Sequence, residues 1–143
     1  MRNNRTTSES AVNTPTSEIG VQPAIARVSL RAVTVNDAQA VVAFLARHGH
    51  PARSEAGWRW ALIDNPTRVA LGTDAGWLLE SKGSVVGFLG NLPLRYLQDG
   101  MAVWGASCTV PVVDADARAH GVRLLRAFAT QPGPALVCAQ PGS

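Results

Sequence analysis

Apolar and polar residues alternate over positions 28–33. A period of two places every second side chain on the same face, so this segment is predicted to form a β-strand with one buried face. The next apolar residues recur at intervals of three and four, the spacing of an amphipathic helix: Ala38, Val41, Val42 and Leu45. Asp37 suits the positive start of that helix, and Gly49 and Pro51 suit its end. A strand and then a helix are therefore expected.

A second helix is predicted from Ser54 to the Asn65–Pro66 pair, which acts as its stop signal. Its apolar residues again follow helical spacing: Trp58, Ala61, Leu62 and Ile63. Trp58 and Trp60 lie two residues apart and therefore face different directions. One of them is expected in the core. The other is a candidate for the border of a pocket, although a large aromatic side chain more often supplies buried area than ligand contact.

The pattern then changes to that of strands. Apolar runs at 77–79 and 85–89 flank the turn-forming residues 81–84, which predicts a β-hairpin. A further strand is expected at 101–113, where Pro111 marks a point at which one side of the strand is no longer paired.

A third helix is predicted at 118–129, followed by a short buried strand at 135–139. The helix carries two neighbouring apolar rows, which are Val122, Leu125 and Ala129, and beside them Gly121, Leu124 and Phe128. The predicted order of elements is β-α-α-β-β-β-α-β, so the fold class is α/β.

The composition fits one small globular domain. The 143 residues are 46% apolar and 16% charged, which excludes a wholly disordered, collagen-like or coiled-coil chain. Residues 1–26 hold few large apolar groups, so we expect a disordered tail at 1–26 and a domain at 27–143. Cys108 and Cys138 lack metal-ligand spacing, and no metal site is expected.

The charge and the apolar runs bear on partners and location. The formal net charge of +3 is too small to indicate nucleic-acid binding. No apolar run approaches the length needed to span a bilayer, and the N-terminus lacks the apolar stretch of a secretory signal. We therefore expect a soluble cytoplasmic protein with neither a nucleic-acid nor a membrane partner.

The segment 112–125 carries the clearest chemical signal, because a strand, a short loop and a helix start follow one another there. A helix N-terminus presents unpaired backbone N–H groups and a partial positive charge, so it can hold a phosphate or pyrophosphate. Gly121 would allow such a group to approach the backbone closely.

Arg118 and Gly121 in this loop resemble the GNAT acetyltransferase superfamily, whose pyrophosphate loop reads Arg or Gln, two variable residues, Gly, one variable residue, then Gly or Ala. The order of elements matches the first half of the superfamily, and the resemblance runs from about Val28 to the end of the chain. Two positions depart from the pattern: Arg123 stands where Gly or Ala is expected, and Ala115 where Pro is common. Arg123 would either crowd the pyrophosphate or reach the cofactor phosphates itself.

The second helix is similar to that of a bacterial subgroup of the same superfamily. In that subgroup the helix carries Trp, any residue, Trp, and then an Asn-Pro stop, seen here as Trp58, Trp60, Asn65 and Pro66. The resemblance therefore covers the helices as well as the loop.

The resemblance implies a GNAT-like mixed sheet and an N-acyltransferase that moves an acetyl or other acyl group from acyl-CoA to a small-molecule or peptide amine. The backbone at Val112 and Val113 would hold the pantetheine arm, and a strand N–H beside Pro111 would polarise the thioester carbonyl. The pyrophosphate would lie on the loop residues Arg118, Ala119, His120, Gly121, Val122 and Arg123. Acetyl-CoA is the expected acyl donor.

The amine must lose its proton to a carboxylate, a histidine or an ordered water. Glu80 is the first candidate for this catalytic base, although a charged residue at a strand end can equally face water. His48 and His50 flank Gly49 at the end of the first helix, where a cation also has a plain structural reason. His120 suits charge neutralisation in the phosphate loop better than base catalysis.

Two other readings stay open: a non-catalytic GNAT-like fragment or binding module, and a weak nucleic-acid binder. In the superfamily the fifth strand is followed by a helix and two more strands, and here the sequence ends after the presumed fifth strand at Ser143. A partial domain lacking these elements is therefore expected, with low activity and a tendency to self-associate. The sole tyrosine, Tyr96, does not match by position the tyrosine that often protonates the departing thiolate.

Overall fold

The computed structural model describes residues 27–51 and 53–132. Its helices and strands are, in chain order, β1 (Val28–Ala32), α1 (Ala38–Arg47), α2 (Glu55–Trp58), α3 (Pro66–Leu71), β2 (Gly76–Ser81), β3 (Ser84–Gln98), β4 (Met101–Val113) and α4 (Gly121–Ala129). Short 3₁₀ segments precede α1 and α4, at Val35–Asp37 and Ala115–His120, and a π-helical segment, Arg59–Ile63, continues α2. None of the described helices is long and apolar enough to cross a bilayer.

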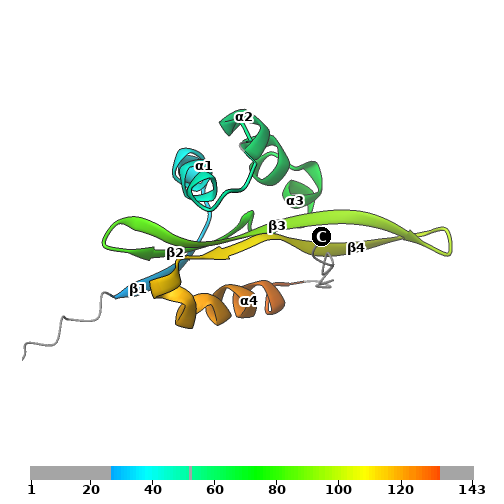
Figure 1. Cartoon of the computed structure of the whole chain (residues 1–143). Helices are drawn as coiled ribbons and strands as arrows, with labels where there is room; N and C mark the ends of the chain where they lie inside the picture. The colour runs from blue at the N-terminus through cyan, green and yellow to red at the C-terminus, as the bar shows by residue number, and fades with distance from the viewer. Residues whose placement is uncertain (1–26, 52, 133–143) are drawn as a thin grey trace, which may run out of the picture.

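The strands form one sheet in the order β1-β2-β3-β4, and every neighbouring pair is antiparallel. The predicted hairpin and the strand at 101–113 are confirmed. The predicted mixed sheet is not seen among the described strands, which are antiparallel throughout. The expected strand at 135–139 and the expected tail at 1–26 lie outside the described residues. Figure 1 shows the β3–β4 hairpin reaching well beyond the helices.

Helices cover both faces of the sheet (Figure 1). On one face, Phe44 of α1 and Trp58 of α2 pack in a core with Leu78 and Phe88 of the central strands. On the other face, α4 packs against a second core that contains Trp77 and Leu79. Because alternate residues of a strand point to opposite faces, consecutive residues such as Leu78 and Leu79 serve the two cores.

The second helix ends near the predicted stop, but the stop pair also begins α3, which was not predicted. The Asn65 side chain accepts hydrogen bonds from the backbone N–H groups of Thr67 and Arg68 at 2.9 and 3.1 Å. Pro66 occupies the first turn of α3. Asn is a favoured N-cap and Pro a favoured first helical residue, so the same dipeptide can end one helix and start the next.

The buried row of α4 is Leu124 and Phe128, each 1% exposed, whereas Val122 and Leu125 are 66% and 51% exposed. Of the two apolar rows predicted for this helix, the row that contains Leu124 and Phe128 is therefore the one that packs on the sheet. The helix begins at Gly121 and not at Arg118, because residues 115–120 form a 3₁₀ segment. Both rows are apolar in sequence, so only docking on the sheet selects one of them.

Candidate functional site

A β-bulge interrupts β4 close to its end. The pairing with β3 shifts by one residue, so Val110 and Pro111 together lie opposite Leu89. Val110 has φ 48°, a left-handed conformation that a β-branched residue adopts only at an energetic cost. Pro111 cannot donate a backbone hydrogen bond. The broken pairing that the proline predicted is therefore confirmed, and backbone strain lies at the same point.

Beyond the bulge, β4 forms the edge of the described sheet. On an edge strand, alternate backbone N–H and C=O groups point away from the neighbouring strand and are open to another partner. Val112 and Val113, the residues expected to hold a pantetheine arm, lie in this last part of β4 and are both half-buried. They pair with Phe88 and Gly87 on their inner side.

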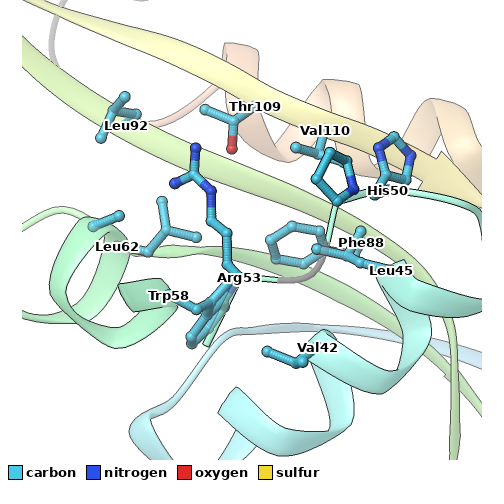
Figure 2. Close-up of a pocket in the computed structure, with 12 residues that line it drawn as sticks. Val42, Leu45, His50, Arg53, Trp58, Leu62, Phe88, Leu92, Thr109 and Val110 are labelled. Carbon is cyan, nitrogen blue, oxygen red and sulfur yellow. The ribbon is translucent and has the colours of Figure 1, made fainter. Parts of the chain in front are cut away.

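A pocket of about 270 Å³ lies beside the bulge, between the α1–α2 region and the sheet (Figure 2). Its walls are mainly apolar: Val42, Leu45, Pro51, Trp58, Ala61, Leu62, Phe88, Leu92 and Val110. Its polar lining groups are His50, Arg53 and Thr109. Since Val110 belongs to both the bulge and the wall, the pocket opens next to the interrupted part of β4.

Gly90 on β3 provides space for the wall formed by Thr109 and Leu62. A Cβ atom at position 90 would lie 2.4 Å from the Thr109 Oγ1 atom and 3.3 Å from the Leu62 Cδ1 atom. Thr109 is paired with Gly90 across the two strands. The missing side chain therefore lets the threonine hydroxyl and the helix approach the sheet at this point.

The two tryptophans of the second helix divide as predicted into one buried and one exposed residue, with 3% exposure at Trp58 and 73% at Trp60. The buried one also lines the pocket, whereas Trp60 does not. The expectation that the tryptophan outside the core borders the pocket was therefore wrong. Trp58 faces the sheet, and the pocket lies between that face and β4.

The loop that follows β4 is a 3₁₀ segment, in which the Ala117 N–H donates to the Asp114 carbonyl at 2.9 Å. Arg118, Ala119 and Val122 are exposed. His120 lines an open hollow of about 590 Å³, to which Lys82 of the β2–β3 turn also contributes. The predicted phosphate-loop residues thus surround the start of α4, at the end of β4.

Gly121 begins α4 in an ordinary helical conformation, with φ −58° and ψ −33°. Among the described residues, a Cβ atom there would meet only the Val113 Cγ2 atom, at 3.4 Å. Neither the backbone conformation nor the packing of the described residues therefore demands a glycine. A glycine at a helix start without such a demand fits a position where a ligand approaches the backbone closely.

Arg123 makes a contact that the sequence did not suggest. Its guanidinium NH1 donates to the Val28 carbonyl of β1 at 2.8 Å. This hydrogen bond ties the first turn of α4 to the start of the sheet. A contact with cofactor phosphates would require the guanidinium to leave this partner.

Glu80 lies in an ion-pair cluster on the α1 face of the sheet. The Arg31 guanidinium donates to both oxygens of Glu80 at 2.7 and 2.9 Å and to both oxygens of Asp37 at 2.7 and 2.8 Å. Hydrogen bonds from Arg31, more than those from Thr34, hold the pKa of Asp37 well below its usual range. The structure thus brings Glu80 together with Arg31 and Asp37 and not with the pocket.

The two histidines at the end of α1 have different environments. The His48 Nε2 atom lies 2.7 Å from the Asp114 Oδ1 atom, which connects α1 to the loop after β4. His50 lines the pocket. Sequence reasoning gave both residues the same structural role at a helix end. The two histidines have different environments because the chain turns between them at Gly49, which has a left-handed φ of 73°.

No protein-family model matches the sequence, and no curated protein matches it significantly. Solved structures do match. An acetyltransferase from Trypanosoma brucei aligns with a TM-score of 0.55 and 17% identity, over 80% of this chain and 84% of that chain. A GCN5-related N-acetyltransferase from Kribbella flavida aligns with a TM-score of 0.53 and 21% identity, over 72% of this chain and 26% of that chain.

A third match is diaminobutyrate acetyltransferase from Paenibacillus lautus, solved in complex with its substrate L-2,4-diaminobutyric acid and coenzyme A. It aligns with a TM-score of 0.51 and 16% identity, over 75% of this chain and 59% of that chain. These similarities show that the chain has the fold of the GNAT N-acetyltransferases.

Proposed function

We propose that this GNAT-fold chain is an acyl-CoA-dependent N-acyltransferase that acylates an amine. The observation that carries the proposal is the bulge at Val110 and Pro111. It interrupts β4 between the apolar pocket and the loop that leads into α4. The edge strand of the described sheet, an apolar pocket and a helix start lie at one place, where donor and acceptor would meet. The diaminobutyrate acetyltransferase with the same fold was solved with coenzyme A and an amine substrate.

The residues around the start of α4 fit the binding of coenzyme A. Neither the backbone conformation nor the packing of the described residues requires a glycine at position 121. Its missing side chain would leave space for a pyrophosphate at the backbone. Arg118 and His120 add cationic or hydrogen-bonding groups beside it, and the edge of β4 at Val112 and Val113 offers backbone groups to the pantetheine amide. The bound cofactor would supply the acyl thioester. The main task of the protein is then to align two reactants.

A base is required to accept the proton of the amine. His50 is the one imidazole among the described lining residues of the pocket, and histidine is the side chain most often used as a general base. Glu80 remains the base predicted from the sequence, but its two oxygens are engaged by Arg31. We therefore favour His50 as the base and give Glu80 a structural role.

Binding and turnover test the proposal separately. Titration calorimetry with CoA and acetyl-CoA should show binding, and a CoA-release assay with a panel of amines should show transfer. His50→Gln should lower kcat about 100-fold or more, in the range typical of a general base, without weakening CoA binding. Glu80→Gln should mainly lower stability. A reversed pattern would reassign the base to Glu80, and failure to bind CoA would end the proposal.

A second candidate is a CoA-binding module without turnover. It is favoured by the absence of any carboxylate among the described residues that line the pocket, and by the engagement of Glu80. The same assays separate the two functions. CoA binding without acyl transfer to any amine would identify the module.

A further inference from the structure

We propose that the pocket beside the bulge selects an acceptor amine that carries an anionic group, a carboxylate or a phosphate, on an apolar stem. The inference rests on the proposed acyltransferase function, and it concerns the part of the acceptor that does not react. Three features of the pocket support it: its charge, a buried donor without a partner, and its apolar walls.

The first feature is the charge of the lining groups. Arg53 and His50 are the ionisable side chains among the described lining residues, and no Asp or Glu is among them. Arg53 makes no hydrogen bond or ion pair within the described part of the chain, unlike the neighbouring Arg59 and Arg68. Figure 2 shows its side chain extending toward β4, where Thr109 lies. A guanidinium in this position is suited to an anionic oxygen.

The second feature is the indole N–H of Trp58. The Trp58 Nε1 atom is buried and has no hydrogen-bond partner among the described residues. The whole residue is only 3% exposed, and it lines the pocket. Buried N–H groups are normally satisfied, so an acceptor atom in the pocket would complete this site. The indole is a donor only, so an acceptor such as the oxygen of a carboxylate or phosphate suits it.

The third feature is the apolar walls of the pocket. Together with the charge of Arg53, they set the orientation of the ligand. A protonated amine is disfavoured beside Arg53 by like-charge repulsion, so the anionic end belongs there. The apolar stem would pack on Leu62, Leu92 and Phe88. The amine would then lie at the other end of this stem, away from Arg53. A cationic surrounding also favours the neutral amine, which is the nucleophilic form.

Matched amines test the inference. 6-Aminohexanoate, 3-aminopropyl phosphate and hexylamine should be compared in acyl transfer, with direct binding measured by calorimetry in the presence of CoA. We expect the two anionic amines to have a KM at least tenfold lower than hexylamine. The better of the two distinguishes a carboxylate from a phosphate. Equal or better use of hexylamine would overturn the inference and leave the acyltransferase function standing.

Substitutions locate the effect in the pocket. Arg53→Gln should raise the KM and Kd for the anionic amine at least tenfold and leave those for hexylamine and CoA unchanged, and Arg53→Lys should restore part of the loss. Trp58→Phe keeps the ring and removes the donor, and should act in the same direction. Arg59→Gln, an exposed arginine outside the pocket, is the matched control. An equal effect of Arg53→Gln on charged and neutral amines would refute the role of its charge.

Calorimetric binding of the amines, measured beside acyl transfer, separates the proposed pocket specificity from the proposed acyltransferase function. Arg53-dependent binding of the anionic amine without any transfer would support the pocket and refute the acyltransferase function. Transfer to neutral amines without binding of anionic ones would support the acyltransferase function and refute the proposed pocket specificity.

Discussion

Replacing Gly121 with alanine should stabilise the fold and weaken the binding of CoA. The glycine begins α4 with φ −58°, and within the part of the chain that the structure describes an added Cβ would meet only the Val113 Cγ2 atom, at 3.4 Å. Alanine is favoured over glycine in a helix by about 0.5–1 kcal/mol. For a domain of this size, that gain corresponds to a rise in Tm of about 2–6 °C.

The loss in binding follows from the backbone surface that the methyl group would cover. If it displaces a phosphate oxygen from one N–H group, the lost charged hydrogen bond costs about 1.5–3 kcal/mol. This free energy corresponds to a Kd about 10- to 150-fold higher. Gly121→Glu should weaken binding further, because its carboxylate would also repel the pyrophosphate.

Thermal unfolding followed by circular dichroism and calorimetric titration with CoA measure the two effects. Arg126→Ala is the control, because Arg126 is an exposed residue in the last turn of the same helix. It should change the Tm and the Kd little. An unchanged Kd in Gly121→Ala would refute the assignment of the phosphate loop. A lower Tm would refute the argument that the fold itself does not need this glycine.

Three further changes test the surrounding structure. Gly90→Ala should destabilise the protein by about 1–3 kcal/mol in urea unfolding, because the new Cβ would lie 2.4 Å from the Thr109 hydroxyl; unchanged stability would contradict the close packing at the pocket wall. Because Arg31 lowers the pKa of Asp37, the folded state binds this proton less readily than the unfolded state, and the stabilisation present above about pH 4 is lost as the pH falls through and below that value. Asp37→Asn should lower stability at pH 7 and flatten the decline in Tm between pH 5 and pH 2, whereas an unaltered decline would show that other carboxylates cause it. Arg123→Gln should lower the Tm by removing the hydrogen bond to the first residue of β1 while leaving the Kd for CoA unchanged, and a large rise in that Kd would show that the guanidinium reaches the cofactor.

Local patterns in the sequence were sufficient for most of the elements. The period-two segment at 28–33, the apolar runs around the 81–84 turn and the proline in β4 all act through neighbouring residues, so their outcomes were predictable. The GNAT resemblance rested on the same kind of information, a short loop motif and an order of elements, and the fold agrees with it.

Tertiary packing decided between structural alternatives that the local sequence leaves equivalent. The two apolar rows of α4 differ only in which one meets the sheet, and docking buried Leu124 and Phe128. Asn65 and Pro66 carry signals for both the end and the start of a helix, and the chain uses both. Local propensities cannot distinguish such cases, because the free-energy difference comes from contacts with distant residues.

The candidate site shows the same division. Arg118 and Gly121 were recognised because their motif is contiguous. The pocket could not be recognised from the sequence, because its lining residues lie between positions 42 and 110 of the chain. They form a pocket only when α1 and α2 pack on β3 and β4. Long-range contacts also place Glu80 against Arg31 and bring the segment with His50, Arg53 and Trp58 to one pocket with Thr109 and Val110 of β4. The sequence determines the chemical type of each side chain. The partners of that side chain, and hence its role, are determined by the packing that lowers the free energy of the whole fold.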